Sequence, residues 1–461
     1  MEADFIILGV GISSHKTDGV IRFEKYCRAY DLPYIIVGDG IPWRGGNLND
    51  NPGGGHKIIE ILNTIEKMDN KLIIICDTFD LFPVAGRDEI MKKYCHLCGI
   101  EKPTDEKHKI VISSEIYCWP NKLLADVYPN VSTKYKYLNS GCIMGFRDEI
   151  YHILKNNPVK DRDDDQLFYT LQYLNGKNII LDYQCCLFQT LAGVSDDIVV
   201  HRNRVYNKYT NSYPIFIHGN GHGKPLLNHI ENYIECNPKA DYSLFDIRKC
   251  NPEPRVFIAL YVDSSKYRSN DLFMSHIVDI RYNNKVVYVY DKDLNTDNKS
   301  AVEASGYVYK TSKEYVFSDF LESDCQYYFL LDQKSIITDR DILHNLLPHM
   351  HDGYRILAPL LRDRDNDKFT NFWGALSGSG YYKRSDDYMD IVSYNKRGFW
   401  NAPYVSHAIL FDRNIIQNWD VAQKNRFSEG DMDMSLCYNL RRNTCFMYMV
   451  NLKEYGYLNT R

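Results

Sequence analysis

Two stretches of this chain each begin with an apolar, strand-like segment and then alternate strand-like with helix-like segments. In the first stretch, residues 5–10, 34–37 and 72–76 are rich in Ile, Leu and Val. Between them, residues 22–30 and 57–68 have apolar residues at helical spacing. The order strand, helix, strand, helix, strand predicts an α/β fold with a parallel sheet and right-handed crossovers.

The same alternation restarts after a polar connector. Periodicity lapses between residues 236 and 255, where Pro238, Pro252 and Pro254 are mixed with Asn, Lys and Asp. Strand-like segments then follow at residues 256–262, 286–290 and 327–331. The 461 residues have room for roughly two to four domains of ordinary size. We therefore expect two domains, residues 1–240 and 250–461.

Composition excludes several classes of protein. A formal net charge of −5 provides no broadly basic surface for nucleic acid. No apolar run reaches the ~20 residues of a membrane-spanning helix. The sequence starts Met-Glu-Ala-Asp, acidic where a secretory signal would be basic, so we expect a cytoplasmic protein unless a leader precedes it. The 13 cysteines are an odd number, and we expect most to be reduced.

The motif that points most directly to chemistry follows the strand at residues 72–76. Asp77 and Asp80 come directly after it, at the edge of an α/β sheet where ligands usually bind. Carboxylate oxygens suit Mg²⁺ or Mn²⁺ bridging a diphosphate. The alternative is that Asp77 only caps a helix or turn.

A glycine-rich loop follows a second short apolar strand, in the sequence IFIHGNGHGK at residues 215–224. Glycines such as Gly221 let the backbone approach a ligand closely, and Lys224 could neutralise a phosphate. Asn220 lies in the same loop, and His218 could complete a metal site with Asp77 and Asp80. The alternative is that His218 is a solvated loop residue.

An acidic run precedes a helix-like pattern. Asp163, Asp164 and Asp165 are consecutive and lead into Gln166. Helix capping explains one of these aspartates. Three adjacent carboxylates repel one another, so a site that binds hydroxyls or stabilises a developing positive charge is the alternative.

Two further segments offer ligand contacts. Trp43 opens a glycine-dense stretch that ends at Lys57. It could wrap a nucleotide, and the alternative is a flexible surface turn. Trp119 and Asn139 lie on either side of residues 128–137. Aromatic faces and amides recognise sugars, although a core tryptophan is an equal alternative.

In this order, the motifs resemble those of the glycosyltransferase domain of the multifunctional procollagen lysyl hydroxylases. The shared motifs are WRGG, GGG-x-K, D-x-x-D, LNSG, DDDQLFYT, FQTL and HGNG-x-x-K. The second half resembles the accessory domain of that family through NFWGALS, YYKRSDDY and WNAPY. The resemblance implies two tandem GT-A (Rossmann-like) domains, a catalytic one and an accessory, noncatalytic one.

The resemblance also implies a Mn²⁺-dependent, retaining transfer of glucose from UDP-glucose to galactosylhydroxylysine of collagen. By this resemblance Mn²⁺ would be held by Asp77, Asp80 and His218, and the transfer step served by Asp164, Asp165 and Asn139. Residues expected to line the donor pocket are Trp43, Lys57, Thr78, Phe79, Asn220, Gly221 and Lys224. Those expected near the substrate are Trp119, Asp163 and Gln166.

Some residues depart from the family's pattern. Phe79 stands where tyrosine is common, so stacking on uracil can persist without a hydroxyl contact. No H-x-D occurs among the 14 histidines, so a lysyl hydroxylase activity would have no facial triad. In the second half, Asp332 is followed by Gln333 and Lys334, and a lysine there opposes a cation.

The hypothesis from sequence is therefore a collagen galactosylhydroxylysine glucosyltransferase. One rival is transfer of galactose or glucose directly to hydroxylysine, and another is an inactive collagen-binding module. The oligomeric state stays open. Related animal enzymes work in the endoplasmic reticulum, which is the alternative compartment if a leader is missing. Frequent Asn, Lys, Ile and Tyr fit an AT-rich genome such as that of a large DNA virus.

Overall fold

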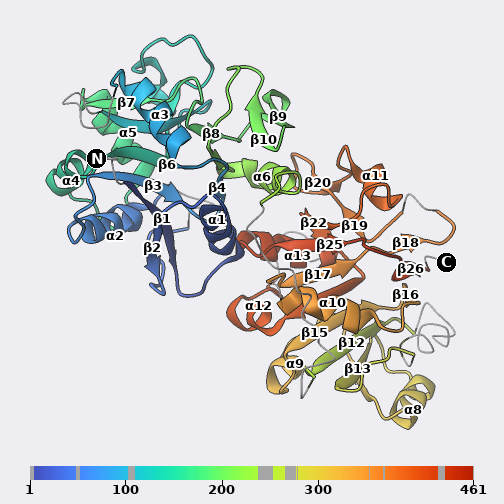
Figure 1. Ribbon diagram of the computed structural model, residues 1–461. Helices are drawn as coiled ribbons and strands as arrows, with labels where there is room; N and C mark the ends of the chain where they lie inside the picture. Colours follow the sequence, from blue (N-terminus) through green and yellow to red (C-terminus); the bar gives the residue numbers. More distant parts are fainter. Residues whose placement is uncertain are drawn as a thin grey trace. The chain divides into compact units, whose positions relative to one another are not determined.

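The chain forms two compact units, Met1–Ala240 and Asp241–Arg461, in this computed structural model (Figure 1). The structure describes residues 5–47, 52–101, 109–236, 253–264, 277, 279–351, 353–366, 369–423 and 431–459. Most of the polar connector predicted from sequence, residues 237–252, lies outside the described residues. We refer to the two parts as unit 1 and unit 2 and describe each by itself.

Unit 1 is built on a six-stranded sheet of order β2-β1-β3-β6-β5-β7. Its strands are β1 (Phe5–Ser13), β2 (Tyr34–Asp39), β3 (Leu72–Asp77), β5 (Ile110–Glu115), β6 (Tyr137–Phe146) and β7 (Ile179–Leu181). β1 is parallel to β2 and β3, as predicted. The rest of the sheet is not all parallel, because β6 runs antiparallel to both β3 and β5. A run of apolar residues indicates that a strand is buried on both faces of a sheet, but it does not indicate the direction of the strand.

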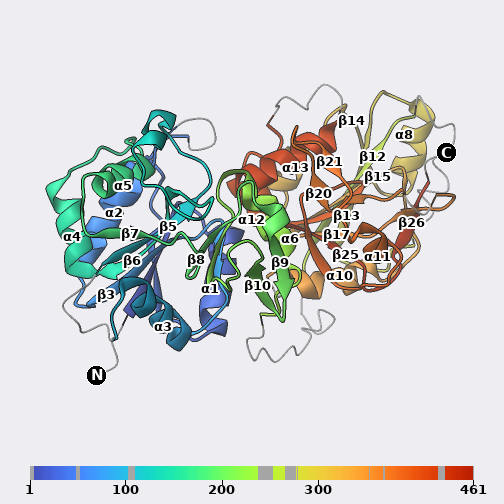
Figure 2. The ribbon, with the colours of Figure 1, turned by 90° about the horizontal axis from the view of Figure 1, so that it is seen from above.

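Helices cover both faces of this sheet (Figures 1 and 2). α1 (Asp18–Ala29) and α3 (Arg87–Cys98) contribute to one buried apolar cluster. α2 (Gly55–Ile65), α4 (Arg147–Asn156) and α5 (Asp165–Leu174) contribute to the other. The sheet is therefore sandwiched between helices, as expected for an α/β domain.

A smaller three-stranded sheet lies beside the main one. Its order is β4-β11-β8, from β4 (Leu81–Pro83), β8 (Phe188–Thr190) and β11 (Phe216–His218). The remaining elements are α6 (Lys224–Glu231), the strands β9 (Ile198–His201) and β10 (Arg204–Asn207), and the 3₁₀ turns η1 (Lys122–Asp126), η2 (Ser195–Asp197) and η3 (Gly221–Gly223).

Helix α1 starts four residues before the predicted segment, at Asp18, because Thr17 caps it. The Thr17 side chain accepts a hydrogen bond from the backbone N–H of Val20. Because Gly19 lies in the first turn, the hydrophobic pattern of the sequence does not extend to this start of the helix. A Cβ atom at Gly19 would lie 2.2 Å from the carbonyl oxygen of Phe79, so a glycine lets α1 pack against the turn between Asp77 and Asp80.

Unit 2 repeats the central strand pattern of unit 1 in an eight-stranded sheet of order β14-β13-β12-β15-β24-β17-β25-β22. β12 is parallel to β13 and β15, and β15 is antiparallel to β24. The strands of this sheet are β12 (Val256–Val262), β13 (Lys285–Asp291), β14 (Val308–Thr311), β15 (Tyr327–Asp332), β17 (Ile356–Pro359), β22 (Phe399–Ala402), β24 (Ala408–Asp412) and β25 (Met447–Val450).

The other elements of unit 2 surround this sheet. Its helices are α8 (Thr296–Ala304), α9 (Ser318–Glu322), α10 (Ile342–His351), α11 (Tyr388–Val392), α12 (Arg413–Asn418) and α13 (Met432–Arg442). Its short strands are β16 (Ser335–Ile337), β18 (Arg362–Asp363), β19 (Phe372–Trp373), β20 (Ala375–Leu376), β21 (Tyr382–Lys383), β23 (Tyr404–Val405) and β26 (Gly456–Leu458). Within the described ranges, no helix is both long and apolar enough to span a bilayer.

Candidate functional site

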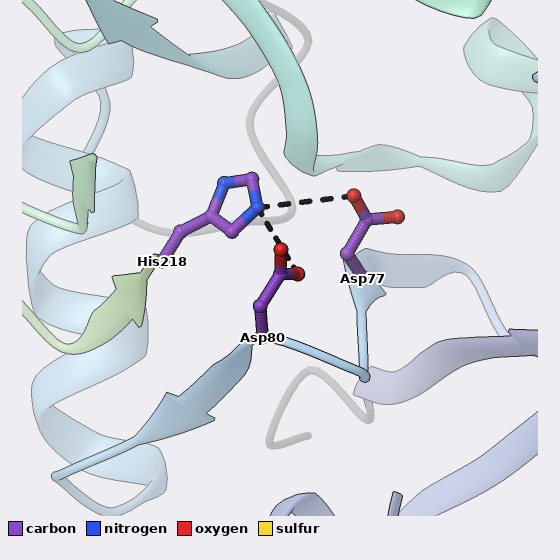
Figure 3. A group of neighbouring side chains, drawn as sticks. All are labelled: Asp77, Asp80 and His218. Carbon is purple, nitrogen blue, oxygen red and sulfur yellow. Dashed lines mark ion pairs between the residues drawn. The ribbon is translucent and has the colours of Figure 1, made fainter. Parts of the chain in front are cut away.

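Two aspartates and a histidine meet at one edge of the unit 1 sheet. Asp77 is the last residue of β3, Asp80 lies in the turn before β4, and His218 ends β11. One ligand atom from each lies within 4.8 Å of the others. Nε2 of His218 is 3.4 Å from Oδ1 of Asp80 and 3.8 Å from Oδ2 of Asp77 (Figure 3). The structure thus brings together the three residues that the resemblance assigned to a metal.

Strand pairing explains how residues so far apart in sequence meet. β11 pairs antiparallel with β4, which places His218 opposite Leu81, and the N–H of Gly219 donates to the carbonyl oxygen of Asp80 at 2.8 Å. Gly141 leaves room for the imidazole. A Cβ atom there would lie 2.2 Å from Cε1 of His218, which gives a steric reason for the glycine of the LNSG motif.

Two lysines border the cluster. Nζ of Lys224 lies 2.7 Å from Oδ2 of Asp80. Nζ of Lys57 lies 2.8 Å from Oδ1 of Asp77 and 3.3 Å from Oδ2 of Asp165. Burial alone would raise the pKa of Asp80, but Lys224 and His218 hold it well below its usual range. Burial likewise opposes the charge of Lys57, yet Asp165 and Asp77 raise its pKa, so Lys57 stays protonated.

The donor set suits a divalent cation. Two carboxylates and an imidazole are ligands that Mn²⁺ accepts, since it takes both oxygen and nitrogen donors. His218 has its Nδ1 fixed at 3.1 Å from Oδ1 of Asn139, which leaves Nε2 directed at the aspartates. A hydrogen bond of this kind from the second ring nitrogen orients metal-binding histidines. The residues present therefore fit a metal ion.

The three consecutive aspartates do different things. Oδ1 of Asp164 accepts from the N–H of Leu167 at 2.6 Å and caps α5. Asp163 is exposed, and its Oδ2 accepts from the N–H of Lys160 at 2.8 Å. Asp165 is buried, next to Lys57, and accepts a hydrogen bond from Ser140 at 3.1 Å. Of the three side chains, Asp165 is the one that forms an ion pair with Lys57, which also pairs with Asp77.

The glycine-dense stretch before α2 packs against the segment that precedes α5. The N–H of Gly55 donates to the carbonyl oxygen of Asp163 at 2.6 Å, and a Cβ at Gly55 would lie 2.0 Å from the carbonyl oxygen of Lys160. Gly54 has φ of 107°, a left-handed conformation that favours glycine. The close backbone packing of this stretch brings Lys57 and Asp165 together.

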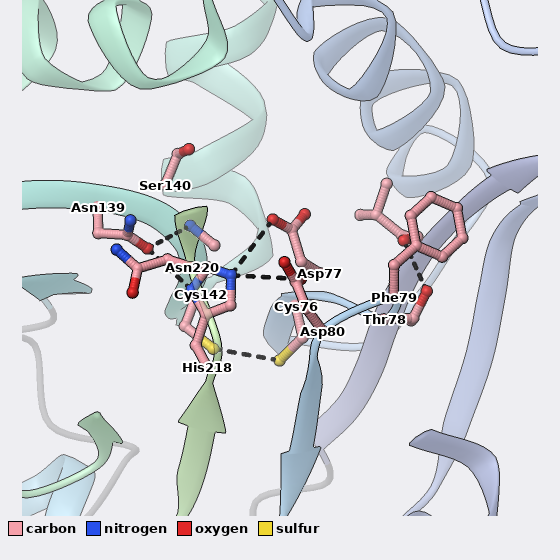
Figure 4. A network of polar contacts seen from close by, with 12 residues as sticks. Cys76, Asp77, Thr78, Phe79, Asp80, Asn139, Ser140, Cys142, His218 and Asn220 are labelled. Atoms are coloured by element: carbon pink, nitrogen blue, oxygen red, sulfur yellow. Dashed lines mark hydrogen bonds and ion pairs between the residues drawn. The ribbon is translucent and has the colours of Figure 1, made fainter. Parts of the chain in front are cut away.

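A buried glutamate that the sequence analysis missed joins three of the predicted residues. The carboxylate of Glu115, the last residue of β5, accepts from side-chain amides of Asn139 (3.0 Å), Gln166 (2.8 Å) and Asn220 (3.0 Å). Figure 4 shows Asn139 and Asn220 beside His218. Burial raises the pKa of Glu115, which the amide donors oppose. Its position at the end of an apolar strand, like that of Asp77, was the available signal.

The remaining predicted residues lie around this centre with other partners. Trp43 donates from Nε1 to the carbonyl oxygen of Gly46 at 2.6 Å. Thr78 is buried and donates to the carbonyl oxygen of Val10 at 2.9 Å. Phe79 is partly exposed, Gly221 is exposed, and Trp119 is 48% exposed. Lys224 is half exposed despite its ion pair.

Both halves of the chain match families of known proteins. Residues 3–241 match the PLOD GT domain, and residues 268–461 match the N-terminal domain of glycosyltransferase family 25. The chain is 48% identical over 458 residues to Uncharacterized protein R699 of Acanthamoeba polyphaga mimivirus, with 99% of this chain and 98% of that protein covered.

Two human proteins are also similar. Procollagen-lysine,2-oxoglutarate 5-dioxygenase 2 of Homo sapiens is 30% identical over 492 residues, covering 98% of this chain and 65% of that protein. Multifunctional procollagen lysine hydroxylase and glycosyltransferase LH3 of Homo sapiens is 29% identical over 496 residues, with coverage of 98% and 65%. The chain thus spans a little under two thirds of the length of these human relatives.

Proposed function

The chain belongs to the family of PLOD glycosyltransferase (GT) domains, and on this premise we propose that unit 1 transfers glucose from UDP-glucose to galactosylhydroxylysine of collagen, retaining anomeric configuration. The supporting observation is the group of Asp77, Asp80 and His218, bordered by Lys57 and Lys224. Charged side chains of this kind suit a nucleotide diphosphate leaving group.

The leaving group needs its negative charge neutralised. Asp77, Asp80 and His218 would hold Mn²⁺, which when bound supplies positive charge to the diphosphate oxygens. Lys224 is half exposed and lies at this cluster, so its ammonium can add a second positive charge. Lys57 has a different task, because it is paired with both Asp77 and Asp165 and holds the two carboxylates in place.

The sugar needs negative charge beside it as the glycosidic bond breaks. Asp165 is suited to this, since its carboxylate lies at the edge of the cluster and is oriented by Ser140 and Lys57. Asp164 supports it by capping the helix on which Asp165 lies. The amides of Asn139, Gln166 and Asn220, held by Glu115, are groups that can bind sugar hydroxyls.

The direct experiment is UDP release by the full chain with Mn²⁺ and each UDP-sugar in turn. The acceptors are free galactosylhydroxylysine, deglucosylated collagen and collagen carrying unmodified hydroxylysine. We expect turnover with UDP-glucose and the galactosylated acceptors. Turnover with only the unmodified acceptor would favour direct transfer to hydroxylysine, and no turnover with any pair would refute the enzyme proposal.

A further inference from the structure

Unit 1 exposes four large apolar side chains within eleven consecutive residues. Exposed fractions are 45% for Tyr117, 48% for Trp119, 86% for Leu123 and 60% for Val127. Single exposed apolar residues are ordinary on protein surfaces, but several on one short surface segment are less common, and exposed apolar patches mark interaction sites. We call these four residues the apolar strip.

The segment that carries the apolar strip is held firmly on its inner side. Asn121 caps the turn η1 by accepting from the N–H of Leu123 at 3.0 Å. Leu124 packs against the apolar cluster under the sheet. Tyr128 is buried there too, and its hydroxyl lies 3.2 Å from Oγ1 of Thr170. Leu124 thus faces the core while Leu123, its neighbour, faces solvent, so the exposure of Leu123 is built into the fold.

One end of the apolar strip, Tyr117 and Trp119, borders the candidate site. It follows directly after Glu115, and Nε2 of Gln166 donates to the carbonyl oxygen of Trp119 at 3.3 Å. At the same end, the ring of Tyr117 lies 5.8 Å from the ring of His222, which stands between Asn220 and Lys224 in the glycine-rich loop. Tyr117 and Trp119, at one end of the apolar strip, therefore contact residues of the candidate site, and Leu123 and Val127 continue the strip along the chain from there.

We propose that the apolar strip binds the polypeptide on which the acceptor sugar is carried, through an extended, proline-rich segment next to the modified residue. This inference rests on the proposed function. Leucine and valine side chains offer nothing to a diphosphate or a sugar hydroxyl, whereas proline-rich chains dock on aromatic and apolar surfaces. Such chains are already extended in the polyproline II conformation, so ordering them costs little entropy.

The test compares a peptide acceptor with a free one in the full chain. The variants are Leu123→Ser and Val127→Ser, with Leu294→Ser as the matched control, because Leu294 is a 66% exposed leucine of unit 2. Each is assayed with UDP-glucose and Mn²⁺ against a Gly-Pro-rich peptide that carries galactosylhydroxylysine, and against free galactosylhydroxylysine. Loss of a partly buried leucine contact should raise the KM for the peptide about tenfold.

We expect kcat, and the KM for free galactosylhydroxylysine, to stay unchanged in all variants, and the control to match the wild type with both acceptors. An unchanged peptide KM in both Leu123→Ser and Val127→Ser would overturn the inference alone. So would a change confined to self-association, measured by light scattering, which would identify a second copy as the occupant. If the wild type turned over neither the peptide acceptor nor free galactosylhydroxylysine, the proposed function would be overturned, and this inference with it.

Discussion

In both units an aspartate ends the outer strand of a parallel trio, the strand that also pairs with an antiparallel neighbour: Asp77 on β3 and Asp332 on β15. The surroundings then differ. Three residues later unit 1 has Asp80 and unit 2 has Ser335. Continuing the registers by one residue, Gly141 of unit 1 corresponds to His407 of unit 2. The two units thus share a strand order and differ in the chemistry at its edge.

His407 stands where unit 1 has a glycine. Its φ is 68°, in the left-handed region that non-glycine residues seldom adopt, and its Nδ1 lies 2.5 Å from Oδ2 of Asp332. Burial would raise the pKa of Asp332, but His407 lowers it. Burial would lower the pKa of His407, but Asp332 raises it. Asp332 is therefore already paired with a histidine of the chain itself.

A cation site requires more than a well-placed aspartate at the end of a strand. Unit 1 gathers two carboxylates and an imidazole whose Nε2 faces them, while in unit 2 the imidazole of His407 is hydrogen-bonded to Asp332 and also interacts electrostatically with Asp433. Within the part of the chain that the structure describes, Asp77, Asp80 and His218 are the one group of three ligand side chains that could hold a metal ion. We propose that catalysis takes place at this group of unit 1 and that unit 2 has an accessory role.

The largest effect should come from removing a carboxylate that only unit 1 has. Asp80→Ala is expected to lower UDP release at least about 100-fold, because one charged ligand for the diphosphate's counter-ion is lost. Ser335→Ala, at the matching place of unit 2, should leave turnover unchanged. Steady-state assays of both variants check this, and an equal loss in the two would mean that unit 2 takes part in catalysis.

The next effect concerns Glu115, whose strand β5 corresponds to β17 of unit 2, where the strand ends at Pro359 instead. Glu115→Gln places an amide against three amide donors and should lower turnover about 10- to 100-fold, as loss of second-layer support does at metal sites. Glu149→Gln, at an exposed position of α4, is the control. Unchanged kcat/KM in Glu115→Gln would show that the three amides hold their places without it.

A smaller effect should separate two adjacent aspartates. Asp165→Asn is expected to keep UDP-glucose binding, measured by calorimetry, and to lower kcat about tenfold through loss of negative charge beside the sugar. Asp164→Asn should change kcat little, because asparagine caps a helix as well as aspartate does. If Asp164→Asn is the more damaging variant, Asp164 and not Asp165 serves the transfer step.

The smallest effect is a stability difference in unit 2. Burial raises the pKa of Asp433 to about 6, above the ~3.9 of an unfolded aspartate. Between pH 5 and 7 the folded carboxyl loses its proton while the unfolded one stays ionised, so the folded state binds more protons and stability falls as pH rises. Tyr315 donates to Asp433 at 2.6 Å, a bond that asparagine can keep.

Chemical denaturation at pH 5 and pH 7 checks this. Between pH 5 and pH 7, the free energy of unfolding of the wild type should fall by about 1 kcal/mol more than that of Asp433→Asn. Identical pH dependence of the two proteins would mean that Asp433 is ionised in the folded state throughout.

Sequence patterns located the strands well, because buried strands are almost wholly apolar. Residues 256–262 were predicted as a strand and form β12, and 72–76 lie within β3. The apolar pattern does not encode the direction of a strand in the sheet, so it did not predict that β6 is antiparallel. The start of α1 was also missed, since Thr17 and Gly19 act through a cap and a close backbone contact rather than through hydrophobicity.

The candidate site was predictable where residues end strands and unpredictable where they act through partners. The ordered motifs led to Asp77, Asp80 and His218, and the structure brings them together. Glu115 carried no motif of its own, and its role follows from hydrogen bonds to Asn139, Gln166 and Asn220 that only the fold creates. The role of the glycines at 53–55 as a packing joint was equally invisible without Asp163 and Lys160 beside them.

The most direct measurement of the central claim is the stoichiometry of UDP binding by titration calorimetry of the full chain, with and without Mn²⁺. We predict one UDP per chain with Mn²⁺, and loss of this metal-dependent binding in Asp77→Ala and in Asp80→Ala while both variants keep the wild-type circular dichroism spectrum. Two UDP per chain, or undiminished Mn²⁺-dependent affinity in both variants, would contradict a single metal and diphosphate site in unit 1.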